Sequence, residues 1–326
     1  MKRVTRMLPA LVALVAATAC AAESVPVSPA PTAATPASQA TASRTPAAAA
    51  VAPTRKVKLG IADITPMGEK SEKVGVGFPI IVTFDRNVKD RDKATVEALL
   101  QVEAEKPAEG AWRWVSDRQV IYRTKTFWKP YQKVLFTAKL SELPGNTGAE
   151  DVSRRFAVGA QNISVVDTRK HTMKVYRNGK LAKKIPISAG SGGYVRNGVD
   201  VYLTTSGVHL TMGKKPVETM TSSWMGVTDP KDPRYYKLRI PWAVRISNSG
   251  EYVHQSSGAY HFLGRSNQSH GCVRATPAGA KYFYTISQRG DVVKITGTKR
   301  KLEWNNGWSY WQLNWTQWQK GSALNG

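Results

Sequence analysis

The stretch T-M-K-V-Y-R-N-G-K-L-A-K-K-I-P-I-S, residues 172–188, predicts a β-hairpin. Asn178-Gly179 separates two alternating runs, and this dipeptide favours the two-residue turn that joins antiparallel strands. A second strand-like run, I-S-V-V-D-T, comes just before it at residues 163–168. Further strands are expected around Tyr202, Val208 and Ile246.

One helix and one irregular loop interrupt these strands. Residues 276–288 read as a helix in which Thr276 is the N-cap and Pro277 takes the first helical position. Residues 217–236 contain several Met, Trp and Pro residues and predict a long irregular loop. Loops of this length are often lids over a site.

The preceding part of the chain, residues 56–158, also predicts β-structure. Short alternating runs are separated by Gly, Pro and Asp, a pattern typical of a β-sandwich. Only residues 92–100 look helical, and no cluster of His, Cys and carboxylates is present. We expect this domain to space and orient the next one, with ligand binding as the alternative. The runs begin at Val74, Trp112, Gln119 and Lys133.

The chemistry is concentrated in S-H-G-C, residues 269–272, with His254 placed 18 residues before Cys272 on an expected strand. A thiol attacks as thiolate, and an imidazole that accepts its proton makes it a nucleophile. Gly271 lets the backbone turn sharply and lets a carbonyl approach the amides around Cys272. His270 adds a second polar group. The pattern therefore predicts covalent acyl transfer through Cys272.

These residues resemble the L,D-transpeptidases of the YkuD type, whose pattern is His, a spacer of this length, and S/T-H-G-C. The likeness covers residues 163–297, including the hairpin and T-T-S-G-V at 204–208, where many relatives have T-P-x-G. Arg274 fits one branch of the family. Members with an immunoglobulin-like domain before the catalytic domain and a Trp-rich segment after it are the most similar.

The resemblance implies a mainly β fold: an immunoglobulin-like sandwich at 56–158, then a YkuD-type catalytic domain at 159–298 with few helices. It implies that His254 takes the proton of Cys272 and that the thiolate forms a thioester with a peptidoglycan stem peptide. Tyr236, or Tyr235 beside it, would reach the oxyanion together with the backbone N–H of Cys272. It also implies that carbapenems acylate the same cysteine.

Other site residues have less specific roles in this interpretation. Ser269 and His270 are expected to shape the site, and Arg274 is either a carboxylate anchor or a structural cation. The resemblance implies cleavage after the L-centre of the third stem residue and transfer to the side-chain amine of another stem. Water (L,D-carboxypeptidase) and a protein lysine (attachment of proteins to peptidoglycan) remain open as acceptors.

A metal mechanism is the first competing reading. His254, His261, His270 and Cys272 could bind zinc, but their spacing matches no common zinc pattern. We therefore expect neither metal nor cofactor, and we interpret His171 and His209 as ordinary strand residues. A non-enzymatic wall-binding lipoprotein is the other alternative, supported by charge and tryptophans.

The N-terminus predicts export. Residues 1–19 have a basic start and an apolar run, and A-T-A-C at 17–20 resembles a lipobox, which would make Cys20 a lipid anchor on the outer face of the membrane. Residues 20–55 are rich in Ala and Pro and are expected to be a disordered tether reaching into the wall. Only two cysteines are present, so the exported chain would keep Cys272 as a lone thiol.

The formal charge of +24 predicts anionic partners. Because an exported protein meets little nucleic acid, anionic envelope polymers are the expected partners rather than nucleic acid. The last segment, 299–326, holds five of the ten tryptophans. Four of them are spaced 3, 4 and 3 residues apart, which predicts one face of a helix that ends at Gly321 and packs on the catalytic domain. Sugar stacking and membrane contact are the alternatives. The five are Trp304, Trp308, Trp311, Trp315 and Trp318.

Overall fold

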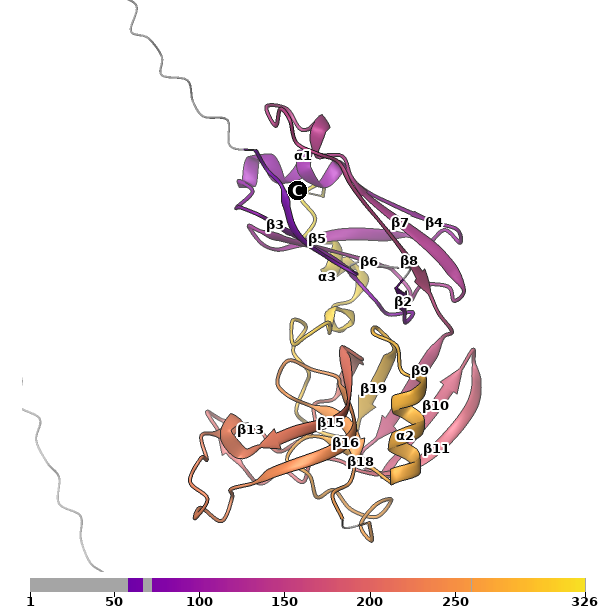
Figure 1. Ribbon diagram of the computed structural model, residues 1–326, viewed down its shortest axis with the longest axis vertical. Helices are drawn as coiled ribbons and strands as arrows, with labels where there is room; N and C mark the ends of the chain where they lie inside the picture. Colours follow the sequence, from indigo (N-terminus) through magenta and orange to yellow (C-terminus); the bar gives the residue numbers. More distant parts are fainter. Residues whose placement is uncertain (1–57, 67–71, 259, 326) are drawn as a thin grey trace, which may run out of the picture. The chain divides into compact units, whose positions relative to one another are not determined.

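The computed structural model describes residues 58–66, 72–258 and 260–325. The expected signal segment, the Cys20 anchor and the tether all lie outside these residues. No helix within the described ranges is both long and apolar enough to cross a membrane. The prediction of a mainly β fold is confirmed (Figure 1).

The first folded domain consists of two four-stranded sheets. Most of their buried apolar side chains, among them Val82, Val120 and Phe136, belong to one hydrophobic core. Alternation of buried and exposed residues along β7 places every second side chain in that core. The first sheet is β1 (Ile61–Thr65), β3 (Ile80–Phe84), β6 (Gln119–Thr124) and β5 (Gly110–Ser116); the second is β2 (Lys73–Val74), β8 (Val152–Val158), β7 (Gln132–Ala138) and β4 (Leu100–Ala104).

Two short helical elements connect these strands. The predicted helix at residues 92–100 is α1, Asp90–Ala98, and β4 begins two residues after it. Two acidic side chains, Asp90 and Asp92, lie in its first turn, where they favourably oppose the helix dipole. A 3₁₀ turn, Leu140–Glu142, follows β7.

The second domain is built on a nine-stranded sheet in the order β14-β19-β9-β10-β11-β18-β17-β16-β15. A separate hairpin, β12 and β13, lies outside it. The sheet strands are β9 (Asn162–Asp167), β10 (Thr172–Arg177), β11 (Lys180–Ser188), β14 (Gly207–Leu210), β15 (Gly213–Thr221), β16 (Lys237–Arg245), β17 (Tyr252–Gln255), β18 (Val273–Ala275) and β19 (Val292–Thr296); β12 is Val195–Arg196 and β13 is Val199–Asp200.

The hairpin expected at residues 172–188 is confirmed as β10 and β11. Asn178 and Gly179 both have positive φ, 49° and 79°, as a type I′ turn requires. The expected helix is α2, Pro277–Ile286, and Thr276 Oγ1 caps it by accepting a hydrogen bond from Gly279 N. It packs on β16, β17 and β18; β17 carries His254, and β18 directly follows the S-H-G-C motif (Figure 1).

The irregular loop expected at residues 217–236, between β15 and β16, is shorter than predicted. Residues 217–221 continue β15, because they pair with β16 as far as Thr221 and Lys237. A 3₁₀ turn, Ser222–Met225, then leads to Gly226, whose φ of 82° ends it. The connection from 222 to 236 is fixed at its two ends, since Tyr236 N donates to Ser222 Oγ at 3.1 Å.

The prediction of one continuous helix through the tryptophans is wrong. Residues Tyr310–Gln312 form a 3₁₀ turn, Leu313 is extended, and a new helix, α3, spans Trp315–Gln319. The break is stabilised by a capping box, in which Asn314 accepts from Gln317 N and donates its own N–H to the Gln317 side chain.

Packing of this segment on the catalytic domain alone was also an incomplete prediction. Gln312 Nε2 donates to Val208 O of β14 in the catalytic domain. The indoles of Trp311 and Trp318 instead donate to the first domain. Trp311 Nε1 donates to Gly77 O and Trp318 Nε1 to Ala111 O, each at 2.9 Å. The segment is therefore held to the first domain by tryptophan donors and to the second by Gln312.

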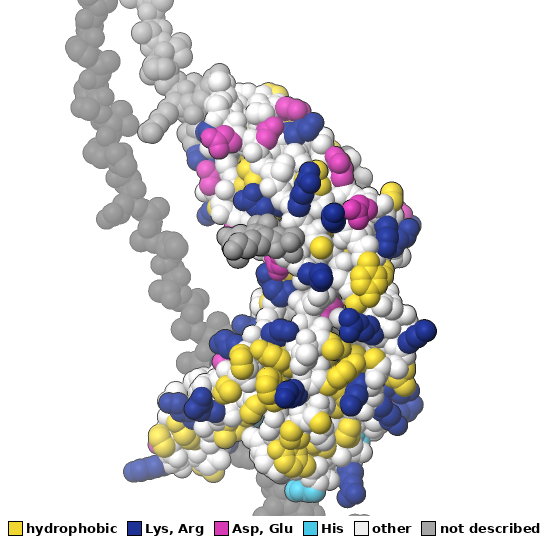
Figure 2. Space-filling view, turned by 45° about the vertical axis from the view of Figure 1, so that its right-hand side comes forward, with side chains coloured by type: hydrophobic (Ala, Val, Ile, Leu, Met, Phe, Trp, Pro, Cys, Tyr) yellow, Lys and Arg dark blue, Asp and Glu magenta, His cyan; other side chains and the backbone are white. Residues whose placement is uncertain are grey.

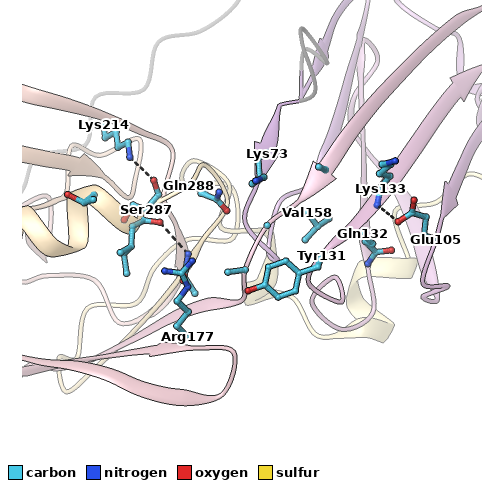
Figure 3. A pocket seen from close by; sticks show the side chains of 16 residues that line it. Lys73, Glu105, Tyr131, Gln132, Lys133, Val158, Arg177, Lys214, Ser287 and Gln288 are labelled. Carbon is cyan, nitrogen blue, oxygen red and sulfur yellow. Dashed lines mark hydrogen bonds between the residues drawn. The ribbon is translucent and has the colours of Figure 1, made fainter.

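The two folded domains meet through backbone as well as side chains. Gly75 N donates to Arg289 O at 2.7 Å, and Arg289 pairs with Glu72 at 2.7 Å. A Cβ at Gly75 would lie 2.2 Å from Asp291 N, so this approach requires glycine. A cavity of 650 Å³ lies nearby, with Arg177, Lys214 and Gln288 on one side and Lys73, Tyr131 and Lys133 on the other (Figure 3).

Candidate active site

Parallel pairing of β17 with β18 brings the two key residues together. Cys272 immediately precedes β18, and His254 pairs with Arg274 in the parallel register. Residues 18 positions apart in the sequence thus come close through the pairing of neighbouring strands. Both side chains line one small cavity of 120 Å³.

His254 is buried, with 4% of its surface exposed. Its Nδ1 lies 2.6 Å from the carbonyl oxygen of Gln255, so Nδ1 carries the proton and Nε2 is left as the acceptor. Burial, with the positive charge of Arg274 as a smaller cause, lowers the pKa of His254 to about 4. The imidazole is therefore neutral near pH 7 and able to take a proton.

Cys272 is half-buried, and its sulfur lies against backbone groups of the turn before β17. The thiol donates to Gly250 O at 3.7 Å, and the backbone N–H of Tyr252 also bonds to the sulfur. Burial raises the pKa of Cys272 to about 12. The resting pair is thus a thiol and a neutral imidazole, and within the described residues no hydrogen bond joins them.

The motif backbone is held by side-chain hydroxyls. Ser269 Oγ donates to Cys272 O at 2.5 Å and accepts from Gly271 N at 3.1 Å. Thr204 Oγ1 donates to Gly271 O at 2.6 Å. Gly271 has φ of 124°, a conformation that side-chain-bearing residues rarely adopt. These bonds fix the turn that presents Cys272.

Aromatic rings form one wall of the site. His270 stacks between Tyr202, with ring centroids 4.5 Å apart, and Tyr236, at 5.3 Å. Trp224 Nε1 donates to the Tyr236 hydroxyl at 2.7 Å, which orients it. Burial raises the pKa of Tyr236, so the hydroxyl keeps its proton near pH 7. Of the two tyrosines considered, it is Tyr236 that lines the cavities beside Cys272.

A second, larger cavity of 400 Å³ opens above the thiol. Tyr236, His270, Gly271 and Cys272 line it, whereas His254, Ser269 and Arg274 line the smaller one with Cys272. Every catalytic and substrate-binding residue named from the sequence is therefore beside the thiol.

Sequence reasoning missed three residues of the larger cavity or its wall: Tyr202, Tyr252 and Arg300. Tyr252 had a signal, because a residue two positions before His254 on a strand faces the same side. Tyr202 and Arg300 had no such signal in the sequence. Tyr202 lies 70 residues before Cys272 and Arg300 lies 28 residues after it, so only the folded structure brings them to the cavity.

The remaining histidines lie elsewhere. His209 is buried in β14, with its ring nitrogens near Thr205 O and Ile246 O. His171 is not a strand residue as expected: it sits in the turn before β10 with φ of 50°, and its Nδ1 contacts Asn267. His261 lines neither cavity. In the described part of the chain, no three His, Cys, Asp or Glu residues converge as a metal site.

Comparisons with known proteins agree with this arrangement. The family described as L,D-transpeptidase catalytic domain matches residues 161–295, and the family described as bacterial Ig domain matches residues 31–144. The chain belongs to the L,D-transpeptidases, with a YkuD catalytic domain behind an N-terminal Ig domain.

Three mycobacterial relatives illustrate the similarity. L,D-transpeptidase 2 of Mycobacterium tuberculosis is 32% identical over 258 residues, which are 77% of this chain and 60% of that protein, so the chain spans about 60% of this relative's length. The structure of LD transpeptidase LdtMt1 in complex with imipenem matches with a TM-score of 0.60 at 26% identity, covering 73% of this chain and 99% of that one. An L,D-transpeptidase from Mycobacterium smegmatis gives 0.58 at 26% identity, over 74% and 100%.

Proposed function

We propose that this protein cross-links peptidoglycan by L,D-transpeptidation, with Cys272 as the nucleophile that carries the acyl group and His254 as its base. The observation that carries the proposal is that His254 on β17 and Cys272, directly before the parallel strand β18, line one cavity. The substrate class comes from the family and from the names of its relatives.

The first half-reaction transfers a proton as the bond forms. Because the resting thiol and imidazole are both neutral, His254 Nε2 accepts the thiol proton while sulfur attacks the carbonyl carbon. The carbonyl oxygen becomes an oxyanion near the backbone N–H of Cys272 and the Tyr236 hydroxyl. The C–N bond then breaks, and the imidazolium gives its proton to the departing amine.

The second half-reaction releases the acyl group. The side-chain amine of another stem's third residue attacks the thioester, a new amide forms, and the thiol regains its proton through His254. Water in place of the amine gives carboxypeptidase activity, and a protein lysine gives protein attachment. The three outcomes share the same acyl-enzyme and differ only in which acceptor reaches it.

The other residues support these steps. Ser269 and Gly271 set the turn that exposes the thiol, and His270 supports Tyr236 by stacking. Arg274 lies beside His254 with its guanidinium 5.9 Å from the ring of Phe262, and among described residues it forms no ion pair. It is placed either to anchor a substrate carboxylate or to hold the imidazole neutral.

The decisive experiment is intact-mass analysis of the full chain with a defined tetrapeptide stem. The expected product is a thioester adduct on Cys272 that an added stem amine converts to a cross-linked dimer. Cys272→Ala should form no adduct. Acylation that persists in this variant would refute the proposal. A Cys272→Ala protein that still binds purified walls as the wild type does would establish wall binding independent of the thiol.

The surface charge fits an anionic envelope as the setting. Figure 2 shows Lys and Arg over both domains of one face, whereas Asp and Glu gather mainly on the Ig-like part. We infer that the chain is exported and held at the membrane through Cys20, with teichoic-type phosphates and stem carboxylates as its anionic contacts. Metal plays no part in this mechanism, so dialysis against EDTA should leave activity unchanged; zinc-dependent recovery would favour the metal alternative.

A further inference from the structure

Charged side chains line the larger cavity beside Cys272, and only some of them have a partner of opposite charge. Two acids and two arginines line it. Glu218 is paired with Lys215 at 2.9 Å, and Glu251 accepts from Thr205 N at 2.7 Å and from the Thr205 hydroxyl. Arg196 and Arg300 form no ion pair within the described residues. Since Lys215 neutralises Glu218, the two arginines stand against the single carboxylate of Glu251, and the charge left over favours an anionic ligand.

Arg300 is the more firmly placed of the two arginines. Its Nη1 donates to Val201 O at 3.0 Å and to Leu203 O at 2.9 Å. Its own carbonyl accepts from Ser206 N at 2.8 Å, so the backbone is fixed as well. A guanidinium has five N–H donors. The donors on Nε and Nη2 have no partner in the described chain and remain for a ligand.

The position of this guanidinium relates it to the bond that is cut. Val201 O, which Nη1 contacts, lies 3.7 Å from where a Cβ of Gly271 would be. Gly271 directly precedes the nucleophile. In a tetrapeptide stem, the terminal carboxylate carbon is three bonds from the carbonyl carbon that sulfur attacks. Arg300, Gly271 and Cys272 line the same cavity, so the guanidinium is within reach of that carboxylate when the scissile carbonyl sits over Cys272.

We propose that Arg300 binds the terminal carboxylate of the donor stem and so selects donors that end one residue after the scissile bond. This inference rests on the proposed function and adds a specificity residue outside the S-H-G-C motif. Arginine suits the role because its planar fork matches a carboxylate. Anchoring of Nη1 on two carbonyls keeps the fork in place before the substrate arrives.

The test compares a tetrapeptide donor with its C-terminal amide, using the full chain and measuring acylation of Cys272 by mass. Wild type should be acylated by the free acid with roughly 10- to 100-fold higher kcat/KM, the range of a charged hydrogen-bonded contact, mostly through KM. Arg300→Gln should lower the free-acid value to that of the amide and leave the amide value unchanged. Arg300→Lys should restore part of the preference.

Lys299→Gln is the matched control, because it removes the same charge from the exposed neighbouring residue. It should keep the wild-type ratio. Labelling of Cys272 by iodoacetamide should proceed at one rate in all variants, which reports an intact site. If Arg300 only supported the backbone, Arg300→Gln and Arg300→Lys would slow acid and amide donors equally, and the proposal would fail.

Two further outcomes separate the inference from the function beneath it. A wild type that is acylated equally by acid and amide overturns the inference and leaves the transpeptidase proposal standing. If the effect of Arg300 disappears only when the carboxylate of the third residue is amidated, Arg300 binds that carboxylate instead. This result would also overturn the inference. A wild type acylated by neither donor refutes the proposed function, and the inference with it.

Discussion

Ser269 Oγ and the carbonyl oxygen of Cys272 are joined by a hydrogen bond of 2.5 Å that closes the S-H-G-C turn. Since the same hydroxyl accepts from Gly271 N, it satisfies a donor and an acceptor next to the nucleophile. Ser269 therefore stabilises the turn and does not itself take part in the bond-making steps. This relationship yields the first prediction.

Ser269→Ala should slow acylation of Cys272. Both backbone groups would be left unpaired, at a cost of about 1–3 kcal/mol each, which corresponds to a rate loss of roughly tenfold or more if the turn relaxes. Ser269→Thr keeps the hydroxyl and should retain most activity. Stopped-flow measurement of carbapenem acylation checks both. Equal acylation rates for Ser269→Ala and wild type would show that Ser269 does not support the turn.

The pH profile of acylation should be flat across the neutral range and fall only at acid pH. His254 has a lowered pKa of about 4, so it stays neutral and basic above that value and loses its acceptor function as the pH falls through it. Cys272 has a raised pKa of about 12, so no rise from thiolate formation is expected near pH 8.5. A rate that climbs tenfold per pH unit through neutrality would contradict a neutral thiol–imidazole pair.

His254→Gln should abolish acylation, whereas His261→Gln should leave most of it. The reason is position: His254 Nε2 is the free acceptor in the cavity of Cys272, and His261 lines neither cavity. Mass analysis after exposure to a carbapenem measures the adduct in each variant. The opposite ranking would assign the base to His261.

Asp291→Asn should flatten the pH dependence of stability. Burial raises the pKa of Asp291 from 3.8 to about 7. The folded state then binds a proton that the unfolded state releases above pH 4. This contribution is fully present below the unfolded value and is lost as the pH rises through about 7, with a slope of up to roughly 1.4 kcal/mol per pH unit.

Local geometry supports a protonated Asp291. Its Oδ2 accepts from Asn162 and Gln288 N, while Oδ1 and the nearby oxygens of Asn162 and Gln288 have no partner in the described chain. A proton on Oδ1 would give such an oxygen a donor. Urea unfolding of wild type and Asp291→Asn from pH 4.5 to 8 measures the difference, with exposed Asp63→Asn as control. Parallel curves for wild type and Asp291→Asn would contradict the raised pKa.

Trp318→Ala should destabilise the fold by about 3–5 kcal/mol, the usual cost of removing a buried indole. Trp318 is fully buried against the first domain and donates to Ala111 O. Trp224→Ala is a useful contrast, because that side chain is 43% exposed and holds Tyr236. It should reduce acylation and leave the unfolding midpoint nearly unchanged. If Trp224→Ala lowered stability and Trp318→Ala did not, the structural role would belong to Trp224 instead of Trp318.

Much of this protein follows from its sequence by itself. Alternation of apolar residues and the Asn178-Gly179 turn specify β-structure locally, because strand period and turn geometry depend on neighbouring residues. The Thr276-Pro277 start of α2 is equally local. The S-H-G-C motif with His254 indicated the family, and the family resemblance added Tyr236 and Arg274; all of these residues line the cavities at the thiol.

Other features required the tertiary structure. The break at Leu313 could not be predicted from the tryptophan spacing, because it depends on tertiary hydrogen bonds: Trp311 and Trp318 donate to the first domain, whereas Gln312 donates to the second. Arg300 enters the cavity only because Ser206 pairs with the segment after β19. Burial decides that thiol and imidazole are both neutral at rest, and desolvation depends on how many distant atoms surround a group, which no stretch of sequence contains.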